Sequence, residues 1–232
     1  MARPRVLLTG FGPFPGAAEN SSAWLVEELA GDRQSSHLGC DLHAEVLPTE
    51  WAEVARLGPG LVQHRRPRLT LHLGLHKRAR GFRIERSAHN LIDLREDARG
   101  AVLDRRTILD RSDHRLDTAI PASQLARHLR TRGLPAVASR SAGTYLCNYL
   151  YYLSLHWARG QNGACDVCFV HLPPSPSQGG PLSEAGLLRG ADLIMRYLLA
   201  FALDRDGAKT SGGETGPGMR VAEPMTRLNR RS

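Results

Sequence analysis

Short hydrophobic runs alternate along the chain with longer segments of helical periodicity. Strands are predicted at residues 5–9, 41–47, 68–75, 135–140 and 164–171, and residues 82–88 are predicted to form another strand or an extended hairpin arm. Helices are predicted from a cap at residues 20–22 to residue 30, and at residues 50–64, 121–131, 144–159 and 183–206, with Thr49 as the cap of the second. Because strands alternate with helices, the pattern predicts a largely parallel α/β/α sandwich.

Two segments fall outside this alternation. Residues 90–117 are charged and rich in turn formers, which predicts an excursion over one end of the sheet. After Gly207 the hydrophobic pattern ends, and residues 207–232 cannot bury enough apolar surface to offset the entropy of ordering them. We therefore expect one domain over residues 1–206, followed by a disordered C-terminal tail.

Composition limits the class of protein. Hydrophobic residues make up 41% and charged residues 23%, the balance of a soluble globular protein. No apolar run approaches the roughly 20 residues of a membrane span, and Val6-Leu7-Leu8 is too short for the core of a signal peptide. These features predict a cytoplasmic protein with no membrane partner.

Net charge and cysteine content argue against two further classes of protein. The formal charge is +8, but the basic residues are not interleaved with exposed aromatic residues and no nucleic-acid motif is present, so a solvated basic surface is favoured over nucleic-acid binding. The four cysteines are too few for a disulfide framework. Cys165 and Cys168 have CxxC spacing, but in a strand they point to opposite faces, which favours burial over metal binding.

The turn before the predicted helix at residues 144–159 carries the first candidate for chemistry. Ser141 to Thr144 are small and polar, and Cys147 falls in the first turn of a long apolar helix. Unpaired N–H groups and the positive end of the helix dipole gather there, and both favour a thiolate. A lone cysteine is also often a small buried hydrophobe, so position alone leaves both interpretations open.

A histidine and a glutamate extend this candidate. His171 closes the predicted strand at residues 164–171, and if the strands are parallel it shares one edge of the sheet with Cys147. A thiol and an imidazole form the minimal pair of nucleophile and base. Glu85 is the best candidate for the carboxylate that orients the imidazole. The alternatives are a histidine that caps a strand end and a glutamate in a surface ion pair.

The loop after the first predicted strand is unusual because it holds two phenylalanines among glycines and prolines. The dinucleotide fingerprint GxGxxG is absent, since Pro15 stands where the third glycine should be. Phe11 and Phe14 either plug the end of the sheet or form a rigid apolar wall of a pocket.

Four ordered motifs make the chain similar to a known family, from about residue 5 to about residue 201. The motifs are Gly10 to Phe14 with Asn20 and Ser22; Glu85, Asn90, Asp93 and Arg95; Ser141 to Asn148; and Phe169 to Pro173. The chain resembles the type I pyroglutamyl peptidases, or pyrrolidone-carboxylate peptidases, which are cytosolic cysteine peptidases. The resemblance implies a three-layer α/β/α sandwich around an open, twisted, largely parallel mixed sheet, and assembly as a homo-oligomer, a dimer or a tetramer.

The resemblance also implies a role for each candidate residue. Cys147 is expected to be the nucleophile, His171 the general base and then acid, and Glu85 the residue that orients His171. The predicted substrate-binding residues are Phe11 and Phe14, which match the aromatic pair that holds the lactam ring, with Arg95, Tyr145 and Leu146. The implied reaction removes N-terminal pyroglutamate from peptides through a thioester and requires neither a metal nor a cofactor.

Two departures from the family pattern keep alternatives open. Many bacterial members have glutamine near Leu75, where this chain is apolar, and the loop at residues 76–81 is unusually basic, with Lys77, Arg78 and Arg80. Both leave room for another cysteine amidase that acts on a different small cyclic or acyl substrate. A non-catalytic homologue that binds peptides or partners is the other alternative, although such a protein has no need of a complete thiol, imidazole and carboxylate set.

Overall fold

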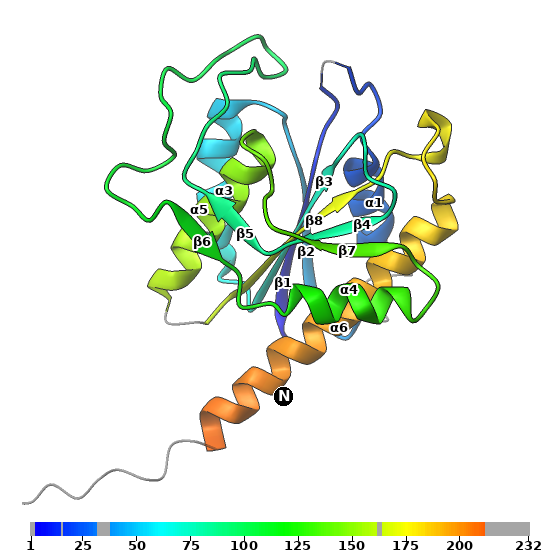
Figure 1. Ribbon diagram of the computed structural model, residues 1–232. Coiled ribbons are helices and arrows are strands. Elements are labelled where there is room, and N and C mark those ends of the chain that lie inside the picture. The colour runs from blue at the N-terminus through cyan, green and yellow to red at the C-terminus, as the bar shows by residue number, and fades with distance from the viewer. Residues whose placement is uncertain (1–2, 15, 32–37, 162–163, 212–232) are drawn as a thin grey trace, which may run out of the picture.

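The computed structural model describes residues 3–14, 16–31, 38–161 and 164–211, with the backbone alone at residues 206–211. A six-stranded sheet with the order β2-β1-β3-β8-β4-β7 forms its centre (Figure 1). The strands are β1 (Arg5–Phe11), β2 (Asp41–Leu47), β3 (Leu69–Leu75), β4 (Phe82–Glu85), β7 (Ala136–Ser139) and β8 (Asp166–Leu172). The first three strands and β8 run parallel, whereas β4 and β7 are parallel to each other and antiparallel to β8.

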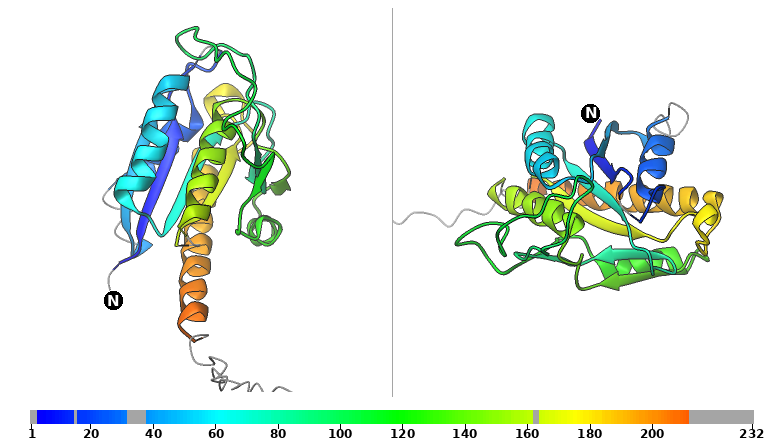
Figure 2. Two further views of the ribbon diagram at one scale, coloured as in Figure 1. Left: turned by 90° about the vertical axis from the view of Figure 1, so that its left-hand side faces the viewer. Right: turned by 90° about the horizontal axis from the view of Figure 1, so that it is seen from above.

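Helices cover both faces of this sheet (Figure 2). One face of the sheet packs in a hydrophobic core with α1 (Ser21–Ala30), α4 (Ala122–Arg130) and α6 (Glu184–Ser211). The other face packs in a second core with α3 (Trp51–Arg65) and α5 (Leu146–Gly160). The predicted three-layer α/β/α sandwich around a mixed, largely parallel sheet is confirmed. Within the described part of the chain, no helix has both the length and the apolar character needed to cross a membrane.

The strand β8 shows how the two cores divide the sheet. All of its residues are buried, as expected for a strand covered on both faces. Val170 and Leu172 face the core of α6, whereas Val167 and Phe169 face the core of α5. Full burial of such a side chain contributes about 1.5–3 kcal/mol. His171 has the same parity as Phe169 and therefore lies on the α5 face.

The segment that leads into the excursion at residues 90–117 differs from the prediction. Residues 82–88, predicted as a strand or an extended hairpin arm, contain two strands, β4 and β5 (Ser87–His89). β4 belongs to the main sheet, whereas β5 pairs antiparallel with β6 (Arg115–Asp117) in a separate ribbon. The Asn90 side chain holds the excursion together, because its Oδ1 accepts from Ile108 N and Leu109 N at 2.8 and 2.9 Å. This part of the chain lies above the strand ends at the top of Figure 1.

Two predicted helix ends are wrong. Thr49 does not cap α3: the N-cap residue is Glu50. The Thr49 hydroxyl donates to Gly12 O at 2.9 Å, a tertiary hydrogen bond, and does not accept from an N–H of the first helical turn as a cap would. The last helix passes the predicted end at Asp206 and reaches Ser211, since a glycine inside a helix costs only about 1 kcal/mol. The rest of the predicted tail, residues 212–232, lies outside the described residues.

A tight contact between α6 and the sheet gives a test of this packing. A Cβ added at Gly190 would lie 2.1 Å from Phe82 Cζ. We expect Gly190→Ala to lower the free energy of unfolding by about 1–3 kcal/mol in chemical denaturation, in spite of the gain in helix propensity. Gly60→Ala in α3 is the matched control, because nothing lies within 4 Å of the added Cβ, and it should raise stability by about 0.5–1 kcal/mol. Effects of the same sign would contradict the contact.

Candidate active site

The first strand runs two residues beyond its predicted end at residue 9, so Phe11 is the last residue of β1 and only Phe14 lies in the loop. Hydrogen bonds around Gly12 fix the start of this loop. The Gly12 carbonyl accepts from Asn20 Nδ2 and from Thr49 Oγ1, both at 2.9 Å, and its N–H donates to Leu47 O at 2.9 Å. Asn20 also caps α1, where its Oδ1 accepts from the N–H of Ser22 at 3.1 Å. These bonds hold the loop at the carboxyl end of β1, with Phe11 buried and Phe14 half-buried.

His171 and Glu85 meet because β4 runs antiparallel beside β8. Arg83 pairs with His171 and Glu85 with Phe169, so all four side chains lie on the α5 face. Glu85 is therefore the diagonal neighbour of His171. The imidazole donates from Nδ1 to Glu85 Oε1 at 2.8 Å, and the two side chains are 6% and 0% exposed.

The environment of this pair favours a protonated imidazole. Burial opposes the charge on His171, but the hydrogen bond and charge of Cys147, together with those of Glu85, outweigh it and raise the pKa of His171 to about 9. The guanidinium of Arg83 lies close by, with Nε 3.7 Å from Glu85 Oε1. Within the described residues, Glu85 Oε2 and Arg83 Nε have no hydrogen-bond partner. The carboxylate thus lies between two cationic groups.

Cys147 occupies the space that a side chain at position 74 would fill. Gly74 pairs with His171 across β3 and β8. A Cβ at Gly74 would lie 3.0 Å from Cys147 Sγ and 2.9 Å from Phe169 Cζ. The glycine therefore lets the thiol and the Phe169 ring approach the sheet next to the imidazole. Cys147 is the second residue of α5, so its N–H has no acceptor within the helix.

The route by which Cys147 arrives differs from the expectation. It was predicted at the end of a parallel strand, but β7, the strand before it, is antiparallel to β8 and ends at Ser139, level with Glu85. Residues 140–145 carry the chain back, held where Asp93 N donates to Thr144 O at 2.7 Å. The Asn148 amide then ties α5 to β5, accepting from His89 N at 2.8 Å and donating to His89 O at 2.7 Å.

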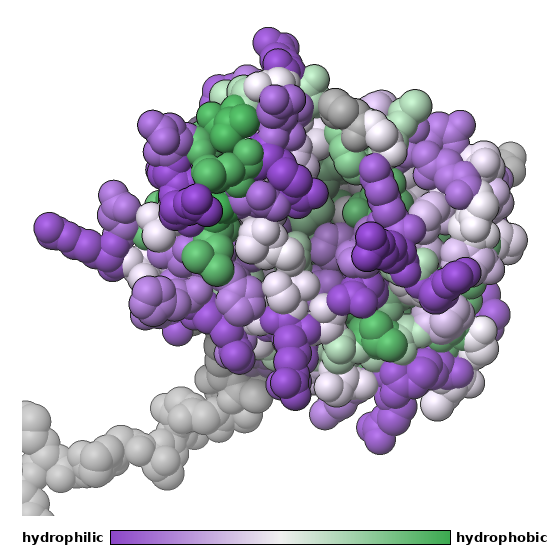
Figure 3. Space-filling model, turned by 45° about the horizontal axis from the view of Figure 1, so that its top comes forward, coloured by the Kyte–Doolittle hydropathy of each residue, from purple (hydrophilic) through white to green (hydrophobic). Residues whose placement is uncertain are grey.

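A cavity of about 600 Å³ opens at the thiol. Figure 3 looks toward the edge where the parallel strands end and shows hydrophilic side chains around a recess with hydrophobic surface inside it. The predicted residues that line the cavity are Phe11, Phe14, Arg95, Tyr145, Leu146, Cys147 and His171. Glu85 is buried behind His171 and does not line it. The structure thus brings all the predicted site residues to one place.

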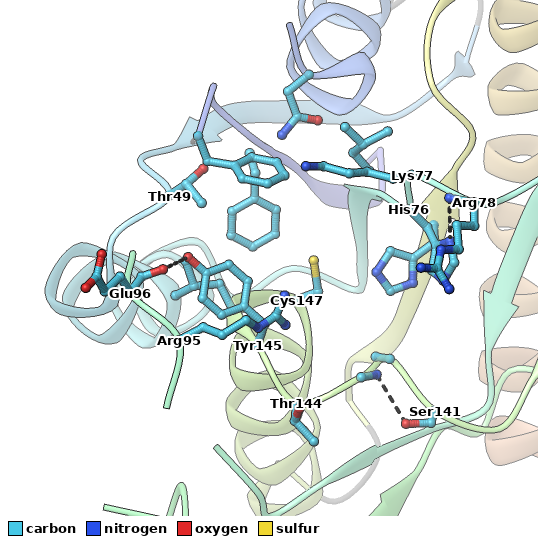
Figure 4. A pocket seen from close by; sticks show the side chains of 18 residues that line it. Thr49, His76, Lys77, Arg78, Arg95, Glu96, Ser141, Thr144, Tyr145 and Cys147 are labelled. Atoms are coloured by element: carbon cyan, nitrogen blue, oxygen red, sulfur yellow. Dashed lines mark hydrogen bonds between the residues drawn. The ribbon is translucent and has the colours of Figure 1, made fainter. Parts of the chain in front are cut away.

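Tyr145 and Arg95 form one wall of this cavity (Figure 4). The Tyr145 hydroxyl donates to Glu96 O at 2.8 Å, and the ring packs edge-on against Trp51 with 5.1 Å between centroids. Arg95 lies over the Tyr145 ring at 4.5 Å and binds Asp93 Oδ2 through Nε at 2.7 Å. The arginine is therefore neutralised by a neighbour and supports the aromatic wall.

Several residues of the site were given no role from the sequence. His76 packs edge-on against His171, with 5.6 Å between ring centroids, while Gly74 and Arg83 flank the imidazole on neighbouring strands. For Arg83 and Gly74 the sequence pattern does indicate a place in the site. Arg83 stands two positions before Glu85 and so shares its face of the strand, and a glycine inside an apolar strand marks a close approach. The contact between His76 and His171 depends on how the loop folds, so no pattern among neighbouring residues predicts it.

The remaining thiols lie in the cores. Cys40, Cys165 and Cys168 are buried, and burial raises the pKa of each thiol, that of Cys165 to about 11. Cys165 and Cys168 belong to different cores, on opposite sides of the sheet. In the described part of the chain, no three His, Cys, Asp or Glu side chains are grouped so as to hold a metal ion.

Comparison with known proteins agrees with this geometry. Residues 4–187 match the family model described as pyroglutamyl peptidase. The chain belongs to this family. The pyrrolidone-carboxylate peptidase of Pyrococcus furiosus is 31% identical over 75% of this chain and 83% of its own length. The pyroglutamyl-peptidase 1 of Rattus norvegicus is 30% identical over 89% of this chain and 96% of its own.

A solved structure of this family shares the fold. The pyrrolidone carboxyl peptidase from Thermococcus litoralis superposes with a TM-score of 0.78 at 25% identity, covering 88% of this chain and 96% of that one. The family resemblance read from four sequence motifs is thereby confirmed, as is membership of a family of cysteine peptidases.

Thiol labelling tests the environment of Cys147. In the native protein, iodoacetamide should alkylate Cys147 selectively, because the other thiols are buried and have raised pKa values. Substitution His171→Ala removes the adjacent cation and should slow this labelling. Peptide mapping by mass spectrometry measures both effects, with denatured protein as the control in which all four thiols react. Equal labelling of Cys165 in the native protein, or no effect of His171→Ala, would contradict the arrangement.

Proposed function

We propose that the protein is a cysteine omega-peptidase that hydrolyses the amide bond after an N-terminal pyroglutamyl residue of peptides. One observation carries the proposal: in a member of the pyroglutamyl peptidase family, a buried His171–Glu85 hydrogen bond of 2.8 Å lies beside Cys147 at a cavity lined by Phe11 and Phe14. These groups supply a nucleophile, an acid–base residue and an apolar binding surface.

The cavity suits a neutral lactam. Pyroglutamate has no free amine, so its site needs an apolar slot and hydrogen-bond partners for the ring amide, and no buried carboxylate. Phe11, Phe14 and Leu146 provide apolar surface, and Tyr145 closes one wall. The fixed geometry of the Gly12 loop keeps the phenylalanines in place before substrate arrives, which lowers the entropic cost of binding.

The first chemical step is attack of the Cys147 thiolate on the carbonyl carbon of pyroglutamate. A protonated His171 beside the thiol favours the thiolate form. Negative charge then develops on the carbonyl oxygen. The N–H of Cys147, at the start of α5, is free to donate to it. Loss of one such donor typically costs about 3 kcal/mol in the transition state.

His171 transfers protons on both sides of the thioester. Its Nδ1–H is held by Glu85, so Nε2 is the nitrogen that faces the reaction. From Nε2 it protonates the leaving amine as the C–N bond breaks and the thioester forms. It then removes a proton from water, which attacks the thioester and releases pyroglutamate and the free thiol.

Location and assembly are further proposals. A cytoplasmic location is supported by the four free cysteines, which suit a reducing compartment. A homo-oligomer is supported by apolar side chains on the excursion, where Leu91, Leu94 and Val102 are 50%, 43% and 47% exposed. Exposed apolar residues gathered on one segment are typical of protein–protein contact surfaces.

Substitution of the reacting groups tests the function directly. Wild-type protein should hydrolyse a fluorogenic pyroglutamyl amide, and Cys147→Ala and His171→Ala should each reduce kcat/KM by about 10³-fold or more. Thermal unfolding of each variant checks that the fold is kept. Activity that survives Cys147→Ala would defeat the mechanism, and hydrolysis of other acyl amides but not of pyroglutamyl amides would indicate a different cysteine amidase.

The pH dependence of kcat/KM tests the role of Glu85. Because the pKa of His171 is raised from 6.5 to about 9, the imidazole stays protonated across that interval, and kcat/KM should fall as pH rises through about 9. Glu85→Gln removes a charge that raises this pKa, so the alkaline limb should move to lower pH. Glu53→Gln on the exposed surface of α3 is the control and should leave the limb in place. An unmoved limb in Glu85→Gln would contradict the proposed role.

A further inference from the structure

The loop between β3 and β4 places positive charge on the cavity wall that the proposed reaction does not use. Lys77 and Arg78 both line the cavity and are exposed. Among the described residues, neither has a carboxylate within ion-pair distance. Arg95 on the other wall differs, since Asp93 neutralises it at 2.7 Å. Among the described residues that line the cavity, the unpaired positive side chains are therefore concentrated on the loop.

The proposed chemistry fixes the side on which the leaving residue lies. His171 must reach the nitrogen of the residue that follows pyroglutamate in order to protonate it. His76 packs against His171 at 5.6 Å, and Arg78 N donates to His76 Nδ1 at 3.3 Å. Figure 4 shows His76 and Arg78 across Cys147 from Tyr145 and Arg95. The leaving residue therefore lies on the side of the cavity that Arg78 flanks.

The charge on that side belongs to Arg78. Burial, together with the nearby charge of His171, lowers the pKa of His76, which therefore stays neutral near pH 7. Lys77 turns toward the lactam slot, where its Nζ lies 5.2 Å from the centre of the Phe14 ring. Glu96, the carboxylate in the cavity lining, comes from the opposite wall, where its carbonyl accepts from Tyr145.

We propose that Arg78 selects substrates that carry a carboxylate on the residue after pyroglutamate. The carboxylate is either the side chain of a glutamate or aspartate, or the free C-terminus of a pyroglutamyl dipeptide. A guanidinium presents paired donors that match a carboxylate. Because Arg78 would bind a carboxylate that takes no part in the reaction, it binds substrate and transition state alike and lowers KM with little change in kcat. The inference rests on the proposed peptidase function.

Four matched substrates test this selection. They are pGlu-Glu-NH₂, pGlu-Gln-NH₂, pGlu-Lys-NH₂ and pGlu-Gln with a free C-terminus. We expect kcat/KM for a carboxylate-bearing substrate to exceed that for pGlu-Gln-NH₂ by about three- to fivefold, mostly through KM, as for a solvent-exposed ion pair. The advantage should shrink as salt is added. A gain for pGlu-Glu-NH₂ assigns the side chain as the source, and a gain for the free acid assigns the C-terminus.

Variants of the loop assign the effect to one residue. Arg78→Gln should abolish the preference, and Arg78→Glu should reverse it in favour of pGlu-Lys-NH₂. Arg80→Gln is the matched control, because Arg80 is exposed on the same loop but does not line the cavity, and it should keep the preference. Lys77→Gln should keep it as well.

Three results would overturn the inference in different ways. Equal kcat/KM for all four substrates would remove the selection and leave the peptidase function standing. A preference that persists in Arg78→Gln, or that Lys77→Gln or Arg80→Gln abolishes equally, would remove the assignment to Arg78. Failure to hydrolyse any pyroglutamyl substrate would defeat the proposed function, and the inference with it.

Discussion

The register between two short antiparallel strands is the constraint on which the site depends. β4 has only four residues, and its pairing with β8 sets Glu85 diagonal to His171. A slip of one residue would turn Glu85 into the core around α6 and bring Ile84 to the imidazole. A fully buried carboxylate is tolerated only with cationic or hydrogen-bonding partners, which here are His171 and Arg83. The pairing of β4 with β8 therefore determines both the site geometry and the stability of this edge of the sheet.

The thiol is positioned by different means. His171 and Glu85 belong to the sheet, whereas Cys147 belongs to α5, which packs on the sheet through Phe169 and Tyr151. Two features set the position of α5 against the sheet near the site. The Asn148 amide fixes the start of α5 to β5, and Gly74 leaves the gap that the sulfur fills. The distance from thiol to imidazole thus depends on helix-to-sheet packing and not on strand pairing alone.

Local signals were enough for some elements and not for others. The bounds of β2 and α1 follow from alternation and from the Asn20 cap, which are properties of neighbouring residues. Strand direction is not encoded in periodicity, so the antiparallel course of β4 and β7 was missed, and Cys147 reaches the site through the return of residues 140–145. Thr49 was misassigned because its hydroxyl donates to a distant carbonyl and does not cap the helix. The roles of the site residues came from motif resemblance, which carries information that spacing lacks.

The division of the cysteines between the two faces has a consequence for redox chemistry. Cys168 points into the core of α6, Cys165 lies at the far end of β8 from His171, and Cys40 precedes β2 at the opposite edge of the sheet. Cys147 therefore has no resolving thiol within reach in its own chain. Oxidation of the reactive sulfur gives a sulfenic acid that cannot be converted to an internal disulfide, so its recovery depends on a small external thiol.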